Sequence, residues 1–117
     1  MQATKASARV IIVNADHMGR GDEELGAKLL ANFLRTLAAI DPKPDAIVFY
    51  NSAVKVLGPA SASVESLKQL EDAGVDLLAC ITCLEFFALT EKIQVGHVSN
   101  MREIGQLLMA AEKVVTL

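Results

Sequence analysis

Short apolar runs rich in β-branched residues alternate with longer amphipathic stretches along this chain, and this alternation limits its fold more than any other feature. The runs over residues 9–15 and 46–50 are typical of strands that are buried on both faces. Between them, from Asp22 to the prolines that follow residue 41, apolar side chains recur at helical spacing. The members of this stripe are Leu25, Leu29, Leu30, Phe33, Leu34 and Leu37. The first half of the chain therefore predicts a strand, one long helix and a second strand.

The same order continues after residue 58. Ser63 is placed to cap a helix that ends at Gly74, and residues 75–79 form a third apolar run. A short helix is expected over residues 84–89, directly after the only two cysteines of the chain. This part of the sequence predicts a helix, a buried strand and a short second helix.

The last quarter of the chain predicts two more strands and a helix. A strand is expected over 93–98, although Gly96 weakens its pattern. Asn100 and Glu103 form a capping pair before an amphipathic helix, and residues 113–117 end the chain as a strand. Strands that alternate with helices in this way indicate an α/β fold: a mainly parallel sheet of about five strands with helices on both faces.

Three distinctive loops follow the carboxyl ends of predicted strands. They cover residues 16–21, 51–55 and 80–83. In an open parallel sheet, ligands bind beyond the carboxyl ends of the strands. We therefore expect these three loops to lie at one edge of the sheet.

The third of these loops holds both cysteines, Cys80 and Cys83. Thr82 and Glu85 have the spacing of a capping box, which predicts that Thr82 is the N-cap and Cys83 the first helical residue. The helix dipole at such a position favours a thiolate, the form that attacks sulfur, binds metal or carries a persulfide. We interpret Cys80 and Cys83 as candidate catalytic residues.

The cysteine pair has three other interpretations: buried structural cysteines, a thioredoxin-like site and a zinc site. Two buried, inert cysteines are a plain alternative, since free cysteine is among the most buried residue types. A thioredoxin-like site is disfavoured because all prolines (Pro42, Pro44 and Pro59) precede the cysteines. Zinc is disfavoured because His17 and His97 lack paired ligand spacing, so no metal and no other cofactor is expected.

Polar residues in the other loops are weaker candidates for a binding role. His17 and Arg20 follow the first strand, and both are placed to project toward the cysteines. The acidic residues at 22–24 would repel phosphate, and neither common phosphate-binding glycine pattern is present.

Three further polar residues complete this candidate set. Asn51 and Lys55 follow the second strand, and Asn100 follows the expected fourth strand. Lys55 would lower the pKa of a thiol if it pointed at one. The bland interpretations are a helix cap for Asn100 and a solvated charge for Lys55.

Composition limits the class of protein. The length of 117 residues predicts one domain. The net charge of −3 and the absence of a cluster of basic residues indicate that the protein does not bind nucleic acid. Hydrophobic residues make up 52% and aromatic residues 4%, and this apolar excess predicts a homo-oligomer. No apolar run approaches the roughly 20 residues of a membrane span. Residues 1–9 lack a signal-peptide pattern and form an expected flexible segment before a single domain over 10–117, so the cytoplasm is the expected location.

Several motifs together resemble a known family. They are the segments 19–26 (GRGDEELG), 49–51 (FYN) with 54–55 (VK), 80–84 (CITCL), and 95–96 (VG) with 99–101 (SNM). In this combination the chain resembles the DsrE-like superfamily, and within it the carboxyl-terminal domain of YedF-like proteins, which are linked to selenium metabolism. The resemblance implies a three-layer α/β/α sandwich, oligomerisation and a sulfurtransferase-like cysteine after the third strand. It favours Cys80 as that cysteine, whereas the predicted helix position favours Cys83.

The chain departs from the family pattern at two positions. Ile81 and Ala53 stand where the family commonly has glycine. YedF-like proteins also usually carry a preceding small domain with its own cysteine, whose contribution would here come from a separate protein. The sequence thus suggests a sulfur- or selenium-handling carrier that exchanges with a donor or acceptor protein. A non-catalytic oligomeric interaction module with the same fold is the alternative.

Overall fold

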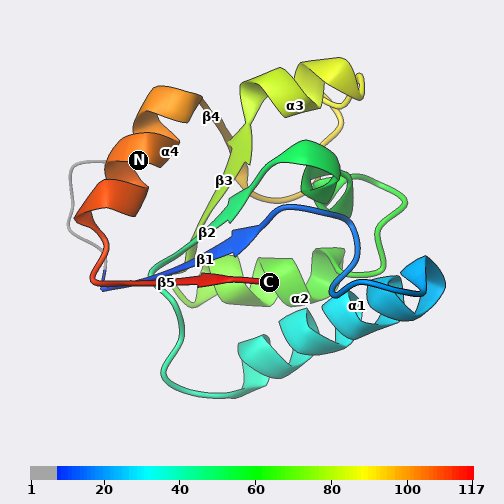
Figure 1. The fold of residues 1–117 in the computed structure, drawn as a ribbon, viewed down its shortest axis with the longest axis horizontal. Helices are drawn as coiled ribbons and strands as arrows, with labels where there is room; N and C mark the ends of the chain where they lie inside the picture. Colours follow the sequence, from blue (N-terminus) through cyan, green and yellow to red (C-terminus); the bar gives the residue numbers. More distant parts are fainter. Residues whose placement is uncertain (1–7) are drawn as a thin grey trace.

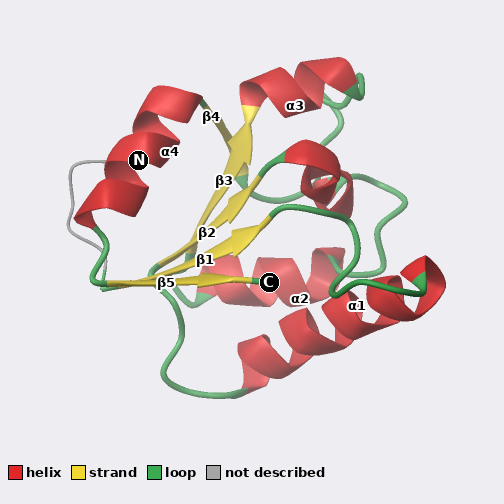
Figure 2. Ribbon diagram, viewed as in Figure 1, coloured by secondary structure: helices red, strands yellow, loops and turns green. Residues whose placement is uncertain are grey.

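The protein is built on a five-stranded parallel sheet with the strand order β4-β3-β2-β1-β5 (Figures 1 and 2). A computed structural model describes residues 8–117. The strands are β1 (Arg9–Val13), β2 (Ala46–Phe49), β3 (Asp76–Cys80), β4 (His97–Ser99) and β5 (Lys113–Thr116). The helices are α1 (Glu23–Ala39), the 3-10 helix η1 (Asn51–Leu57), α2 (Val64–Asp72), α3 (Ile81–Phe86) and α4 (Met101–Ala110). Of the expected segment 1–9, residues 1–7 lie outside the described residues, and Arg9 already belongs to β1.

Helices cover both faces of the sheet, which confirms the predicted three-layer α/β/α architecture. Figure 1 shows α1 and α2 side by side on one face and α4 on the other. The crossovers from β1 to β2 and from β2 to β3 run over the first face, whereas α4 carries the chain back from β4 to β5 over the second. All four strand pairings are parallel, as expected from the alternation of strands and helices.

The central strands are buried on both faces, and each face has its own apolar cluster. Leu30 and Leu34 of α1 pack against the side of the sheet that carries Ile47. Ile104 and Leu107 of α4 pack against the opposite side. The continuous apolar runs in the sequence therefore correspond to strands that must be covered twice.

Several local features differ from the sequence predictions, among them the cap expected at Ser63, whose side chain forms no hydrogen bond at the start of α2. The predicted stripe of α1 is wider than its buried face, since Leu25 and Leu29 are exposed. The strand predicted over 93–98 begins only at His97, because Gly96 has a positive φ of 81° and cannot continue an extended chain. The 3-10 helix η1 was not predicted, because so short an element leaves no clear periodicity in a sequence.

One glycine allows the loop after β1 to lie against α1. A Cβ atom at Gly26 would stand 2.9 Å from the Cβ atom of His17 and 3.1 Å from the carbonyl oxygen of Met18. The Met18 amide also donates a hydrogen bond of 2.9 Å to the Gly26 carbonyl oxygen. Gly26 therefore fixes the path of the loop that carries His17.

Within residues 8–117, no helix has the length and apolar character that crossing a membrane would require.

Two helical glycines should respond in opposite directions to the same substitution. Gly105 lies inside α4 with no atom near a new Cβ, so Gly105→Ala should raise the free energy of unfolding by about 0.5–1 kcal/mol. Gly26→Ala should lower it by about 1–3 kcal/mol, because the loop must move away. Urea titration followed by circular dichroism measures both, and a stabilising Gly26→Ala would contradict the close packing of this loop.

Candidate functional site

The three loops that follow β1, β2 and β3 meet at one edge of the sheet, as the sequence predicted. The Asp16 amide donates a hydrogen bond of 3.0 Å to Ser52 Oγ, which joins the loop after β1 to η1. The Asn51 amide donates a hydrogen bond of 3.0 Å to Cys83 Sγ, which joins η1 to α3. The first turn of η1 therefore links the other two loops.

Cys80 ends β3 and is itself the N-cap of α3. The predicted capping box is wrong: no side chain caps this helix, Thr82 lies inside it, and Cys83 is its third residue. The physical reason is that β3 passes into α3 without a loop, so the extended backbone of Cys80, with φ of −65° and ψ of 123°, already has the N-cap conformation.

The two thiols are close together but differ in exposure. Cys80 and Cys83 are three residues apart where β3 passes into α3, and the neighbouring Cys80 thiol contributes to the raised pKa of Cys83. Cys80 is only 1% exposed and packs on the α4 side of the sheet, whereas Cys83 is half-buried between the two apolar clusters. Both thiols are free. Reagents that enter from solvent therefore meet Cys83 first.

Cys83 receives its hydrogen bond from the backbone, in a conformation that its donor residue rarely adopts. Asn51 has a positive φ of 55°, a region that Asn tolerates better than most residues. Its side-chain oxygen accepts a hydrogen bond of 2.8 Å from the Ser52 amide, which stabilises this turn. The positive φ at Asn51 thus belongs to the tight turn whose first N–H contacts the sulfur.

Burial raises the pKa of the Cys83 thiol above its ordinary value. The N–H of Asn51 acts in the opposite direction, while the hydrogen bond and the charge of Cys80 raise the pKa further. The position of Cys83 near the start of α3 is therefore outweighed by burial, contrary to the expectation from the helix dipole. Cys83 is the third residue of a short helix and packs against apolar side chains, so loss of hydration outweighs the donors that surround it.

Cys83 opens into a surface hollow of about 300 Å³ with aromatic walls. Phe86 is 82% exposed, and its ring meets that of Phe87 edge to face at 5.0 Å between centroids. Lys55 Nζ lies 4.6 Å from the centroid of the Phe87 ring. Lys55 does not itself line this hollow, and its charge lies over the ring of Phe87, which does. Asn51 and Thr82 complete the lining.

His17 and Arg20, which were expected to project toward the cysteines, have other surroundings. His17 Nδ1 lies 3.1 Å from Asp16 Oδ1, and Asp16 is in turn bonded to Ser52. Arg20 is exposed, and within the described part of the chain it forms no ion pair. Neither residue lines the hollow at Cys83.

Asn100 caps α4. Of its neighbours, Ser99 lies beside Cys80 and contacts Glu103, and the sequence analysis did not include Ser99 or Glu103 in the site. The Asn100 side chain accepts a hydrogen bond of 2.8 Å from the Glu103 amide, which confirms the predicted cap. Ser99 is only 4% exposed, pairs with Cys80 across β3 and β4, and donates a hydrogen bond to the Glu103 carboxylate. The sequence held no signal for this contact beyond the capping pair itself.

The residues considered as zinc ligands do not come together. His97 Nε2 lies 2.8 Å from Asp76 at the start of β3, whereas the cysteines are at and beyond its end. Over residues 8–117, no group of three or more histidine, cysteine or acidic side chains is arranged to hold a metal ion.

Comparison with known proteins identifies the family. The model of the DsrE/DsrF-like family matches residues 9–117. The chain belongs to this family. The resemblance to DsrE-like proteins is thereby confirmed. Among curated proteins, none matches the chain significantly.

Several solved structures share this fold. The YchN protein from E. coli aligns with a TM-score of 0.62 at 20% identity, covering 94% of this chain and 98% of its own. A protein of unknown function from Methanobacterium thermoautotrophicum has a TM-score of 0.59 at 22% identity, with 87% and 89% covered. A conserved protein of unknown function from Bacteroides thetaiotaomicron has a TM-score of 0.61 at 14% identity, with 100% and 99% covered. At these identities the likeness establishes the fold.

The raised pKa of Cys83 predicts how its alkylation depends on pH. In Cys80→Ser, which leaves Cys83 as the only thiol, the rate with iodoacetamide should be low at pH 7 and should still increase above about pH 8.5, because only the thiolate reacts. Mass spectrometry of the intact protein follows the reaction, with an unfolded peptide containing residues 80–86 of the same variant as control. A titration midpoint below that of the peptide would contradict the effect of burial.

Proposed function

We propose that this protein is a cytoplasmic sulfur- or selenium-handling carrier in which Cys83 receives the chalcogen atom and Cys80 discharges it. The observation that carries this proposal is the placement of Cys83, whose Sγ accepts the Asn51 N–H and opens into the hollow while Cys80 lies buried beside it. Membership of the DsrE/DsrF-like family supports it. The order of the two cysteines follows from their exposure.

Loading requires one sulfur atom to pass from a donor persulfide to Cys83. The Cys83 sulfur attacks the outer sulfur of the donor, the donor's sulfur–sulfur bond breaks, and the released donor thiol takes the proton that Cys83 loses. Cys83 then carries a persulfide. The Asn51 N–H favours the negative charge that develops on Sγ during attack, which offsets part of the cost of burial. A donor in the hollow excludes water, so this hydrogen bond gains strength when the reaction occurs.

Discharge uses the second cysteine. The Cys80 thiolate attacks Cys83 Sγ, the bond to the outer sulfur breaks, and hydrosulfide leaves. The two cysteines are oxidised to a disulfide while the outer sulfur is reduced, so the electrons balance. A dithiol reductant, which is a separate protein partner in this proposal, restores both thiols. Selenium follows the same steps through a selenosulfide.

A non-catalytic interaction module is the second candidate function. The raised pKa of Cys83 favours it, because a protonated thiol is a poor nucleophile. Ile81 at the start of α3, where the family commonly has glycine, favours it as well. The two candidates differ in whether Cys83 accepts sulfur at all.

Sulfur loading should depend on Cys83 and survive the loss of Cys80. After incubation of the reduced protein with a persulfide-loaded cysteine desulfurase, we expect a mass gain of one sulfur atom that a reductant removes. Cys83→Ser should abolish this gain, because its sulfur is the one open to the hollow. Cys80→Ser should load and then hold the sulfur longer, because it lacks the discharging thiol.

The matched comparison is between these two single variants and the variant with both substitutions. If the double variant gains sulfur as readily as the parent, the adduct does not form on these cysteines and the carrier proposal fails. If the parent gains none while the donor loads a known acceptor, the interaction module is the better proposal.

We also propose that the protein forms a homo-oligomer through exposed apolar side chains. Leu25 and Leu29 are exposed one turn apart on α1, and Val114 and Val115 are exposed on the edge strand β5. A second copy of the chain is a partner that would cover such surfaces.

Oligomerisation predicts a mass that is a multiple of 12.5 kDa in light scattering at micromolar concentration. The double variant Leu25→Lys with Leu29→Lys should lower the mass if α1 forms the contact, and it should still fold because both side chains are exposed. A parent protein of 12.5 kDa under these conditions would contradict the proposal.

A further inference from the structure

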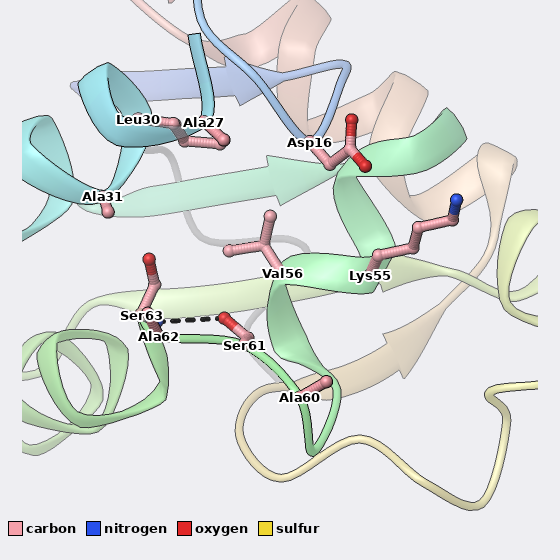
Figure 3. Close-up of a pocket in the computed structure, with 10 residues that line it drawn as sticks. All are labelled: Asp16, Ala27, Leu30, Ala31, Lys55, Val56, Ala60, Ser61, Ala62 and Ser63. Atoms are coloured by element: carbon pink, nitrogen blue, oxygen red, sulfur yellow. Dashed lines mark hydrogen bonds between the residues drawn. The ribbon is translucent and has the colours of Figure 1, made fainter. Parts of the chain in front are cut away.

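A second hollow lies at the same edge of the sheet, between α1, η1 and the start of α2. Its volume is about 290 Å³, close to the lower end of small-molecule sites. Figure 3 shows Leu30, Ala27 and Ala31 of α1 on one side, Val56 of η1 beneath, and the segment from Ala60 to Ser63 opposite α1. Neither cysteine lines it, so it is separate from the hollow at Cys83.

The hydroxyl of Ser63 lies at this hollow without a hydrogen-bond partner among the described residues. Its side chain is only 6% exposed, yet its hydroxyl forms no cap on α2, and no residue between 8 and 117 hydrogen-bonds that hydroxyl. Among the described residues, every fully buried side-chain nitrogen or oxygen has a hydrogen-bond partner. The Ser63 oxygen has none, so it is not fully buried and remains open to the hollow. In Figure 3 the hydroxyl points toward α1 across the hollow. A buried serine of this kind is available to a ligand.

Further donors surround Ser63. Ser61 Oγ accepts a hydrogen bond of 3.0 Å from the Ser63 amide, drawn as the dashed line in Figure 3, so its own hydroxyl hydrogen remains available. The first amides of α2, which begin at Val64, have no partner within the helix. Hydroxyls and amides at the positive end of a helix favour a small anion, whereas Glu65 in the first turn of α2 disfavours one with more than a single charge.

The rest of the lining limits this anion to one with an apolar body and a single charge. Apart from Lys55, the walls from α1 and η1 consist of short aliphatic side chains, with Leu30 and Val56 the largest. Asp16 stands at the far end, where a second negative group would be repelled. Lys55 does not offset this, because its ammonium lies over the ring of Phe87.

We propose that the hollow at Ser63 binds a small aliphatic monocarboxylate, with the carboxylate on Ser61, Ser63 and the first amides of α2 and the alkyl chain along α1 and Val56. The geometry is independent of the cysteines and goes beyond sulfur transfer. Ser63 acts as the buried donor that orients the carboxylate.

Titration of the full chain with pentanoate, followed by amide chemical shifts, tests this site. We expect saturable shifts concentrated at residues 61–66 and in the methyl groups of Leu30 and Val56. Ser63→Ala should weaken binding by at least about fivefold, because a hydrogen bond to a charged group is lost. Ser66→Ala removes a hydroxyl from α2 but keeps the backbone amide, and it should leave binding unchanged because the Ser66 side chain does not line the hollow. Ala31→Leu should abolish binding by filling the space while retaining Ser63.

Other probes identify the chemistry. Pentan-1-amine should not bind at Ser63, and inorganic phosphate should bind more weakly than pentanoate because it lacks an alkyl chain. Equal binding of either probe, or pentanoate shifts that appear equally at the starts of α1, α2 and α4, would overturn the proposal. Cys83→Ser should retain full pentanoate binding, so failure of sulfur loading and failure of this site are observed separately.

Discussion

Burial of the three central strands on both faces is the constraint on which the rest of this structure depends. Beyond the charged residues that begin β1 and β3, these strands are apolar on both faces and must be covered twice, and parallel strands can be joined only by crossovers. Placing α1 and α2 on one face and α4 on the other meets both requirements. The same arrangement sends every loop that follows a strand to one edge, so both hollows and both cysteines are found there.

The sequence predicted those features that depend on local pattern and burial. The strands near residues 9–15 and 46–50 and the Asn100 cap were predictable because hydrophobic periodicity and capping geometry involve residues close in sequence. The start of α3 was not, because the end of β3 fixes the N-cap at Cys80 and leaves no role for a capping side chain. A capping motif directly after a buried strand therefore gives an unreliable helix start.

The candidate site shows a similar division. That the cysteines lie with Asn51 at one edge follows from parallel topology. The contacts of Lys55 with Phe87 and of Ser99 with Glu103 depend on how the side chains pack, and no motif in the sequence predicts them. The same holds for the ionisation of Cys83, because the sequence reveals the helix dipole but not the apolar neighbours that oppose it.

The hydrogen bond to Cys83 comes from the main chain of residue 51, and this changes what natural variation at that position would mean. An amide N–H is common to every residue except proline, so the identity of the side chain matters only through the backbone angle that it permits. With φ at 55°, asparagine and glycine are the residues that hold the turn at lowest cost. A relative with glycine here would keep the contact with sulfur intact, whereas one with valine would lose it although the donor is a main-chain N–H.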